Sequence, residues 1–106
     1  MNKEISAQDA AKLRKSDSTV SFLDVREDSE LEICKIDGAI HIPMGEIPER
    51  AESLPKDKTI IVFCHHGMRS ANVQQYLEAK GFENLINLAG GIHAWANSVD
   101  PEVPTY

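Results

Sequence analysis

The sequence predicts an α/β fold in which helices cover both faces of a parallel sheet. Short apolar runs with the composition of buried strands alternate with longer stretches of helical pattern. Parallel strands need a crossover connection, and that connection is usually a helix. Because 106 residues leave room for one domain, we expect a single domain over residues 1–106.

The first predicted elements are a helix and two strands. Ser6 is a candidate N-cap, and residues 7–15 have the pattern of a short amphipathic helix. Residues 20–25, VSFLDV, form an apolar run followed by charged residues, as expected of a buried parallel strand. Residues 39–42 predict a second short strand, which ends at Pro43 because proline has no backbone N–H to donate.

The middle of the chain continues the alternation of helix and strand. Residues 47–54 have a helical pattern, and residues 55–58 form a polar turn. Residues 59–63, TIIVF, are the clearest strand in the sequence because they are β-branched and continuously apolar. Residues 70–80 predict a helix, and Gly81 stands where a glycine commonly ends one.

The last predicted strand covers residues 85–88, and Gly90 and Gly91 open a short helix that continues through Trp95. The tail, residues 100–106, contains two prolines and is expected to be extended. In parallel sheets, ligands bind at the carboxyl ends of the strands. The residue in that position after TIIVF is a cysteine.

Composition and charge exclude several classes of protein. The net charge is −6, so a nucleic-acid-binding protein, which would present a basic face, is not expected. No apolar run is long enough to span a membrane, and the start of the sequence lacks the pattern of a signal peptide. We therefore expect a cytoplasmic protein that binds neither nucleic acid nor membrane, with its two cysteines as free thiols.

Residues 63–70, FCHHGMRS, place Cys64 between the end of a strand and the start of a helix. In such a loop successive backbone N–H groups can point inward, and the helix dipole adds partial positive charge. Both effects favour the thiolate of Cys64, which is the nucleophilic form. Gly67 permits a positive φ in the loop. The alternative is a buried structural cysteine, but the ordered series of strand, cysteine, glycine, arginine and helix favours a nucleophile.

Several segments of the sequence resemble signatures of the rhodanese-like sulfurtransferase family. They are FLDVRE at residues 22–27, DGAIHIP at 37–43, CHHGMRS at 64–70 and LAGGIHAW at 88–95, so the resemblance spans nearly the whole chain. It implies a five-stranded parallel sheet and a cysteine that cycles between thiol and persulfide. We expect no cofactor.

The length of the loop separates related activities. The family's sulfurtransferases resemble C-x4-R, whereas related phosphatases and arsenate reductases use C-x5-R, a wider loop that fits a tetrahedral oxyanion. Cys64 and Arg69 have the C-x4-R spacing. The sequence therefore predicts a sulfurtransferase. Phosphatase or arsenate reductase chemistry is a weaker alternative, and a non-catalytic interaction or regulatory module is another.

The predicted reaction moves sulfane sulfur through a persulfide on Cys64. The donor is thiosulfate or a persulfide, and the acceptor is a thiol, cyanide or a sulfur-carrier protein. The rest of the loop is expected to bind the substrate, because its basic side chains attract an anion to an otherwise acidic protein: His65, His66, Gly67, Met68 and Arg69. His65 stands where thiosulfate-using relatives often carry Arg or Lys, which favours a different physiological donor.

The biological context is suggested by a finer resemblance. Residues 32–34, the CHHGMRS loop and residues 99–106 resemble the rhodanese domain that ends some enzymes activating sulfur-carrier proteins for molybdopterin and thiamin synthesis. Those enzymes are fusions with an adenylating domain, and we expect no adenylating domain within these 106 residues. The resemblance implies a free-standing counterpart with a sulfur-carrier acceptor.

Residues outside the loop are expected to be structural. Asp24 and Arg26 flank a strand end, and we interpret them as an ion pair that supports the loop, which is also what the family resemblance implies. Cys34 is interpreted as a small apolar residue, with a resolving thiol as the alternative. No metal site is predicted from Cys64, His65 and His66, because adjacent residues on a tight loop rarely converge on one ion.

Overall fold

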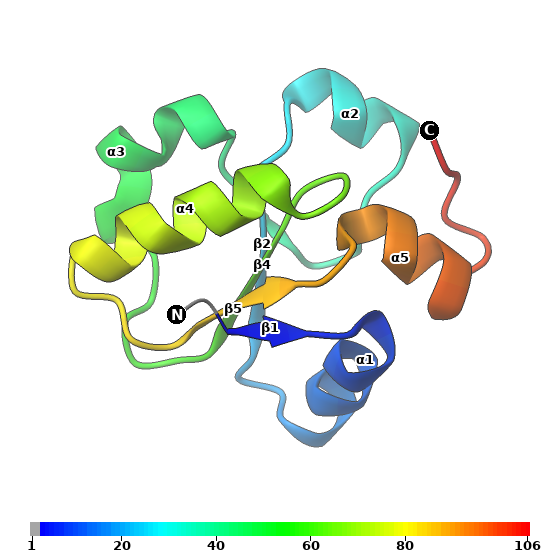
Figure 1. Ribbon diagram of the computed structural model, residues 1–106, viewed down its shortest axis with the longest axis horizontal. Coiled ribbons are helices and arrows are strands. Elements are labelled where there is room, and N and C mark those ends of the chain that lie inside the picture. Colours follow the sequence, from blue (N-terminus) through cyan, green and yellow to red (C-terminus); the bar gives the residue numbers. More distant parts are fainter. Residues whose placement is uncertain (1–2) are drawn as a thin grey trace.

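The computed structural model describes residues 3–106 and contains a five-stranded sheet in which neighbouring strands are parallel (Figure 1). The strands lie in the order β1-β5-β4-β2-β3, which places β4 at the centre of the sheet. The predicted fold class is confirmed. The strands are β1 (Glu4–Ile5), β2 (Ser21–Asp24), β3 (Ile40–His41), β4 (Ile60–Phe63) and β5 (Leu85–Leu88).

Helices connect the strands and cover both faces of the sheet. They are α1 (Ala7–Ser16), α2 (Asp28–Ile33), α3 (Ile47–Arg50), α4 (Met68–Ala79) and α5 (Gly91–Ser98), with 3-10 turns η1 (Met44–Glu46) and η2 (Ala51–Ser53). Residues of α3 and α4 pack on one face, and residues of α1 and α5 pack on the other.

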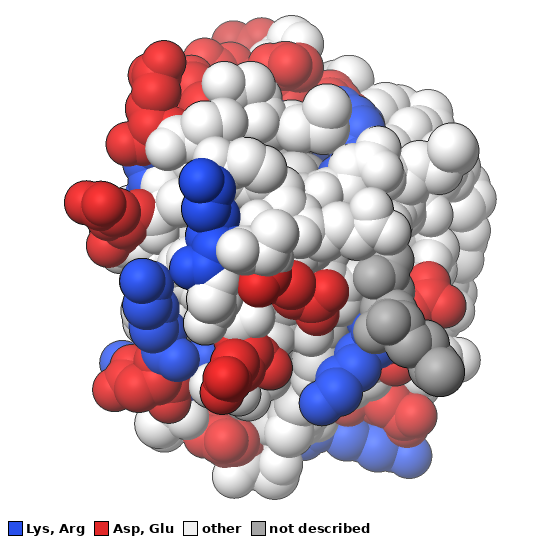
Figure 2. Space-filling model, turned by 60° about the vertical axis from the view of Figure 1, so that its left-hand side comes forward, with Lys and Arg blue, Asp and Glu red and all other residues white. Residues whose placement is uncertain are grey.

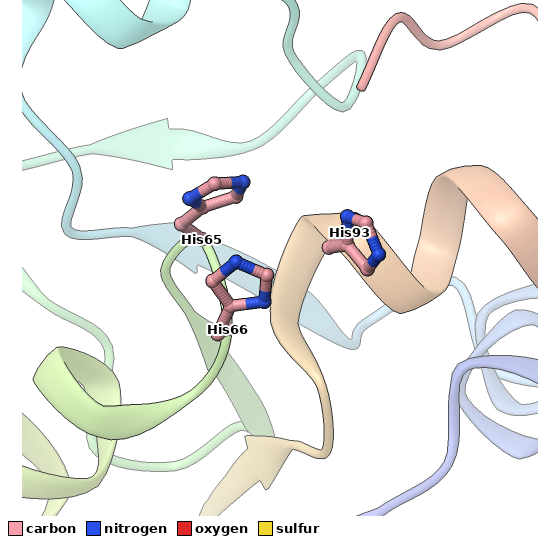
Figure 3. Close-up of side chains that lie close together, drawn as sticks. All are labelled: His65, His66 and His93. Carbon is pink, nitrogen blue, oxygen red and sulfur yellow. The ribbon is translucent and has the colours of Figure 1, made fainter. Parts of the chain in front are cut away.

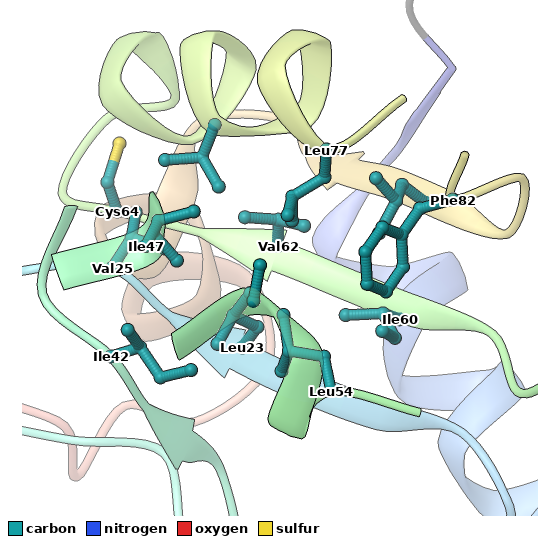
Figure 4. Packing of buried hydrophobic residues seen from close by; sticks show 13 residues of the cluster. Leu23, Val25, Ile42, Ile47, Leu54, Ile60, Val62, Cys64, Leu77 and Phe82 are labelled. Carbon is teal, nitrogen blue, oxygen red and sulfur yellow. The ribbon is translucent and has the colours of Figure 1, made fainter. Parts of the chain in front are cut away.

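Side chains along each strand alternate between two hydrophobic cores, one on each face of the sheet. In β4, Ile60 and Val62 belong to the core under α4, while Ile61 and Phe63 belong to the core under α1 and α5. All four side chains are buried, as expected of a strand covered on both faces. Figure 4 shows the first core, with Cys64 at one end of it.

One strand and one α-helix were not predicted from the sequence. β1 has two residues and pairs with β5, and so short a strand shows no periodicity. α2 has no buried residue and therefore no apolar stripe. Its start is stabilised by a capping box between Glu27 and Glu30, which satisfies backbone N–H groups that lack partners within the helix.

The boundaries of several predicted elements also differ. The strand expected over residues 20–25 covers Ser21–Asp24, and the helix expected over residues 47–54 consists of α3 followed by η2. α4 begins at Met68, two residues earlier than predicted. Its N-cap is Gly67, whose φ of +115° turns the preceding loop into the helix.

Charged side chains of both signs are mixed on the face of the molecule shown in Figure 2. Lys and Arg side chains there lie among Asp and Glu side chains and do not form one continuous basic patch. Within residues 3–106, none of the helices is long and apolar enough to cross a membrane.

Candidate active site

The loop that contains Cys64 lies at the carboxyl end of the central strand. β4 ends at Phe63, Cys64 follows directly, and α4 begins four residues later at Met68. This is the edge of a parallel sheet at which ligands bind. The expected position of Cys64, between a strand end and a helix N-terminus, is therefore found in the structure.

The start of α5 holds this loop in place. The backbone N–H of Ile92 donates to the carbonyl of Cys64 at 2.9 Å, and that of His93 donates to the carbonyl of His65 at 3.1 Å. Gly91 allows this close approach, because a Cβ there would lie 2.5 Å from the Cys64 carbonyl oxygen and would also overlap the His65 carbonyl. The Gly-Gly pair thus fixes the position of the loop by letting a helix N-terminus contact it.

The sulfur of Cys64 is buried and receives hydrogen bonds. The side chain of Cys64 is 1% exposed. Its Sγ accepts the backbone N–H of Gly67 at 3.0 Å and lies 3.4 Å from the hydroxyl oxygen of Ser70. Burial by itself raises the pKa of the Cys64 thiol, but hydrogen bonds from Ser70, Gly67 and the backbone of His66 outweigh burial and lower that pKa below its ordinary value. The site therefore favours the thiolate.

Asn87 on β5 organises the same loop from the neighbouring strand. Its Nδ2 donates to the carbonyl of Gly67 at 3.1 Å, and its Oδ1 accepts the Ser70 hydroxyl at 2.5 Å. The Ser70 hydroxyl carries one hydrogen, and three acceptors lie within its reach: Oδ1 of Asn87, Sγ of Cys64 and, at 3.2 Å, the carbonyl oxygen of Gly67. An ionised sulfur is the stronger acceptor because hydrogen bonds to charged groups are stronger. Sequence reasoning missed Asn87, although it is the one polar side chain in the apolar strand LINL.

We expect Ser70→Ala to raise the pKa of Cys64, because one hydrogen bond to the thiolate is lost. The rate of alkylation of the Cys64 peptide, followed by mass spectrometry as a function of pH, measures this pKa. Ser53→Ala, which removes an exposed hydroxyl bonded to the carbonyl of Arg50, is the matched control and should leave the profile unchanged. Identical profiles for Ser70→Ala and the parent protein would show that Ser70 does not stabilise the thiolate.

Arg69 forms an ion pair with Glu30 of α2. Its Nη1 lies 2.7 Å from Oε1 of Glu30, and its Nη2 lies 2.9 Å from Oε2. This pairing, together with a hydrogen bond from Tyr106, lowers the pKa of the Glu30 carboxyl from 4.5 to about 2. Because the pKa is lower in the folded chain, the pairing stabilises the fold at neutral pH, and this stabilisation is lost as the pH falls from 4.5 towards 2.

Tyr106 joins the tail of the chain to this ion pair. Its hydroxyl donates to Oε2 of Glu30 at 2.6 Å and accepts Nη1 of Arg26 at 2.9 Å. Burial, followed by the hydrogen bond to Glu30, raises the pKa of Tyr106 to about 12, so its hydroxyl remains a donor at neutral pH. In Figure 1 the red C-terminal segment runs from α5 towards α2. Neither Glu30 nor Tyr106 was assigned to the site from the sequence.

Asp24 and Arg26 form a buried ion pair at the carboxyl end of β2, where Asp24 is paired with Phe63 of β4. The two side chains are 1% and 0% exposed, and Nη2 of Arg26 lies 2.8 Å from Oδ2 of Asp24. Arg26 also donates to the carbonyl of Cys34 at 2.8 Å. The pair therefore joins the end of β2 to the segment that follows α2.

The remaining residues of the predicted site have different exposures. His65 is partly buried, and its ring stacks on Tyr106 with a centroid distance of 3.8 Å. Burial, followed by the neighbouring His66, lowers the pKa of His65. His66 is exposed, and Met68 is 80% exposed at the start of α4. His65 and His66 thus remain beside Cys64, whereas Met68 lies at the rim.

Cys34 and Cys64 are both free, buried cysteines. Cys34 packs in the core under α1 and α5, and Cys64 packs in the core under α4, so the two lie on opposite faces of the sheet. A disulfide between them would have to cross the sheet. The position of Cys34 agrees with the interpretation of it as a small apolar residue.

Comparisons with known proteins agree with this fold. The family model described as "Rhodanese-like domain" matches residues 6–98. The chain is 42% identical over 100 residues to the putative sulfurtransferase YtwF of Bacillus subtilis, covering 94% of this chain and 96% of that protein. It is 36% identical over 95 residues to the thiosulfate sulfurtransferase GlpE of Coxiella burnetii, covering 90% of this chain and 88% of that protein.

A solved structure is also similar over its whole length. The crystal structure of a rhodanese-related protein from Thermoplasma volcanium superposes with a TM-score of 0.85 at 35% sequence identity, covering 98% of this chain and 99% of that one. The similarity therefore covers nearly the whole fold.

Proposed function

The chain belongs to the rhodanese-like domain family, and from this premise we propose that it is a sulfurtransferase in which Cys64 carries the transferred sulfur as a persulfide. The observation that carries this proposal is the environment of Sγ, which accepts hydrogen bonds from the loop at the N-terminus of α4. Relatives that are named sulfurtransferases support the same activity. The family match over residues 6–98 supports one rhodanese-like domain over the chain.

The proposed first step is attack of the Cys64 thiolate on the outer sulfur of the donor. A new S–S bond forms at Cys64 while the donor's own S–S bond breaks, and its electron pair leaves with the rest of the donor, which is sulfite for thiosulfate or a thiolate for a persulfide. In the second step, an acceptor thiolate or cyanide attacks the outer sulfur and releases the Cys64 thiolate. The reaction needs no external oxidant or reductant.

The residues around Cys64 stabilise the anion in both halves of this cycle. The thiolate and the persulfide each carry one negative charge, and the N–H of Gly67 and the N-terminus of the twelve-residue α4 are directed at that charge. We assign no general base to the cycle, because the hydrogen bonds to Sγ stabilise the thiolate of Cys64 directly. His65 and His66 are therefore assigned to substrate contact.

The charge near the loop favours a persulfide as donor over thiosulfate. Both terminal nitrogens of Arg69 bind the carboxylate of Glu30, so the guanidinium charge is compensated within the site. Thiosulfate has two negative charges, whereas a persulfide of a small thiol or a protein has one at its sulfur. The expected acceptor is a thiol or a sulfur-carrier protein, and cyanide serves as an artificial acceptor.

We expect mass spectrometry of the protein, purified without reductant and incubated with a persulfide donor, to show one added sulfur atom on the Cys64 peptide. The Cys34 peptide is the internal control and should remain unmodified, because Cys34 packs in the core on the opposite face of the sheet. Addition of dithiothreitol should remove the extra sulfur. An unmodified Cys64 peptide after treatment with both thiosulfate and persulfide donors would favour a non-catalytic interaction module instead.

A further inference from the structure

Three imidazoles converge beside the loop at the sheet edge. His65 and His66 come from the loop, and His93 comes from the first turn of α5 (Figure 3). One potential ligand nitrogen from each residue lies within 4.8 Å of those of the other two. The ring centroids of His65 and His66 are 3.9 Å apart, and those of His66 and His93 are 4.9 Å apart. This cluster joins two segments that are distant in sequence.

The backbone holds the two segments in this arrangement. The N–H of His93 donates to the carbonyl of His65 at 3.1 Å, and the N–H of Ile92 donates to the carbonyl of Cys64. The absence of a side chain at Gly91 allows this contact. The three imidazoles are therefore placed by the same hydrogen bonds that fix the catalytic loop, and assembling them requires no movement of the backbone.

Two of the ring nitrogens lack partners. Nε2 of His65 and Nδ1 of His93 are buried, and neither makes a hydrogen bond to any of residues 3–106. A buried nitrogen without a partner is unfavourable unless something binds it. His66 is exposed, so the cluster can be reached from solvent. The cluster therefore combines two unsatisfied buried nitrogens with an open side.

We propose that His65, His66 and His93 form a binding site for a borderline divalent transition-metal ion, with Zn²⁺ as the ion it fits best. Imidazole nitrogen suits zinc, copper and nickel, whereas calcium and magnesium prefer oxygen ligands. Three protein ligands with a fourth position open to water is the arrangement of accessible zinc sites. A bound ion fixes the two side chains that directly follow Cys64.

The distances are compatible with such an ion after small side-chain movements. In a tetrahedral zinc site with Zn–N distances of about 2.0–2.1 Å, the ligand nitrogens lie about 3.4 Å apart. The ligand nitrogens of the cluster are at most 4.8 Å apart, so they must move closer together by about 1.4 Å or less to bind one ion. The sequence alone did not predict this site, because His65 and His66 are adjacent in the loop and His93 lies on a different element.

Titration with Zn²⁺ tests this site directly. Cys64→Ala protein without a histidine tag is the starting material, so that neither the nucleophilic thiol nor a tag contributes a ligand. Isothermal titration, or competition with a chromophoric chelator, is expected to give one Zn²⁺ per chain. His66→Ala and His93→Ala should each weaken binding by at least about tenfold. Co²⁺ in place of Zn²⁺ should give the absorption bands of a four-coordinate nitrogen site, and these bands should disappear in both variants.

His41→Gln is the matched control. His41 is the one histidine of the sequence that is not part of the cluster, and its Nε2 lies 2.7 Å from the carbonyl oxygen of Arg26. Its replacement should leave Zn²⁺ affinity unchanged. His66 is exposed in a loop, so His66→Ala is expected to fold, and circular dichroism verifies that both cluster variants are folded. Absence of saturable Zn²⁺ binding, or binding that is equally strong in folded His66→Ala and His93→Ala, would overturn the metal site, while the proposal of sulfur transfer at Cys64 does not depend on this outcome.

Discussion

Replacing Cys64 by alanine is expected to abolish sulfur transfer, with the rate falling by at least about 10³-fold. Cys64 is the only cysteine in the loop at the end of β4, and the other cysteine packs in the core on the opposite face of the sheet. Without the thiol, the transferred sulfur has no atom to bind. Formation of thiocyanate from thiosulfate and cyanide, and formation of persulfide on a small acceptor thiol, measure the loss.

Two further variants test whether activity depends specifically on the thiol of Cys64. Cys34→Ser should retain nearly full activity, because Cys34 is 7% exposed and lies in the core under α1 and α5. Cys64→Ser keeps a side chain of similar size but offers a hydroxyl, whose far higher pKa leaves almost no nucleophilic anion at neutral pH. It should therefore be as inactive as Cys64→Ala. Substantial activity in either Cys64 variant would mean that another group carries the sulfur.

The nucleophile was predictable from the sequence because its surroundings are contiguous. Cys64, Gly67 and the start of α4 lie within five residues, and the preceding strand is a continuous apolar run. Local patterns of this kind specify a strand end, a turn and a helix N-terminus without long-range information. The placement of Cys64 at the carboxyl end of a parallel strand followed from the alternation of strands and helices, whereas the central position of that strand is seen only in the structure.

The partners of the loop were not predictable in the same way, because tertiary structure brings them from distant positions. Glu30 lies on α2, a helix without an apolar stripe, and nothing in its local sequence indicates that it binds Arg69. His93 reaches His65 only because α5 packs its N-terminus against the loop. Asn87 had a detectable signal as a polar residue in a buried strand, since a buried amide needs hydrogen-bond partners.

The second large effect is expected from Arg26→Ala, which should lower the free energy of unfolding by about 3–5 kcal/mol. The Arg26 side chain is fully buried and binds Asp24, the carbonyl of Cys34 and the hydroxyl of Tyr106. Its removal leaves the Asp24 carboxylate, 1% exposed, without a counter-charge. It also leaves a cavity between the end of β2 and the segment after α2. Urea unfolding followed by circular dichroism measures the change as a shift of the midpoint.

Arg50→Ala is the control, because it removes an arginine from an ion pair that is exposed to solvent. Arg50 and Glu46 lie 3.2 Å apart, and both side chains are about half exposed, so this substitution should cost less than about 1 kcal/mol. Adding Asp24→Asn to Arg26→Ala removes the uncompensated charge and should restore part of the lost stability, because the buried amide is less costly than the buried carboxylate. If Arg26→Ala lowered the free energy of unfolding by no more than Arg50→Ala does, the buried pair would not be what joins the end of β2 to the segment after α2. If the double variant were no more stable than Arg26→Ala, the loss would come from the cavity and the missing hydrogen bonds, not from the charge left on Asp24.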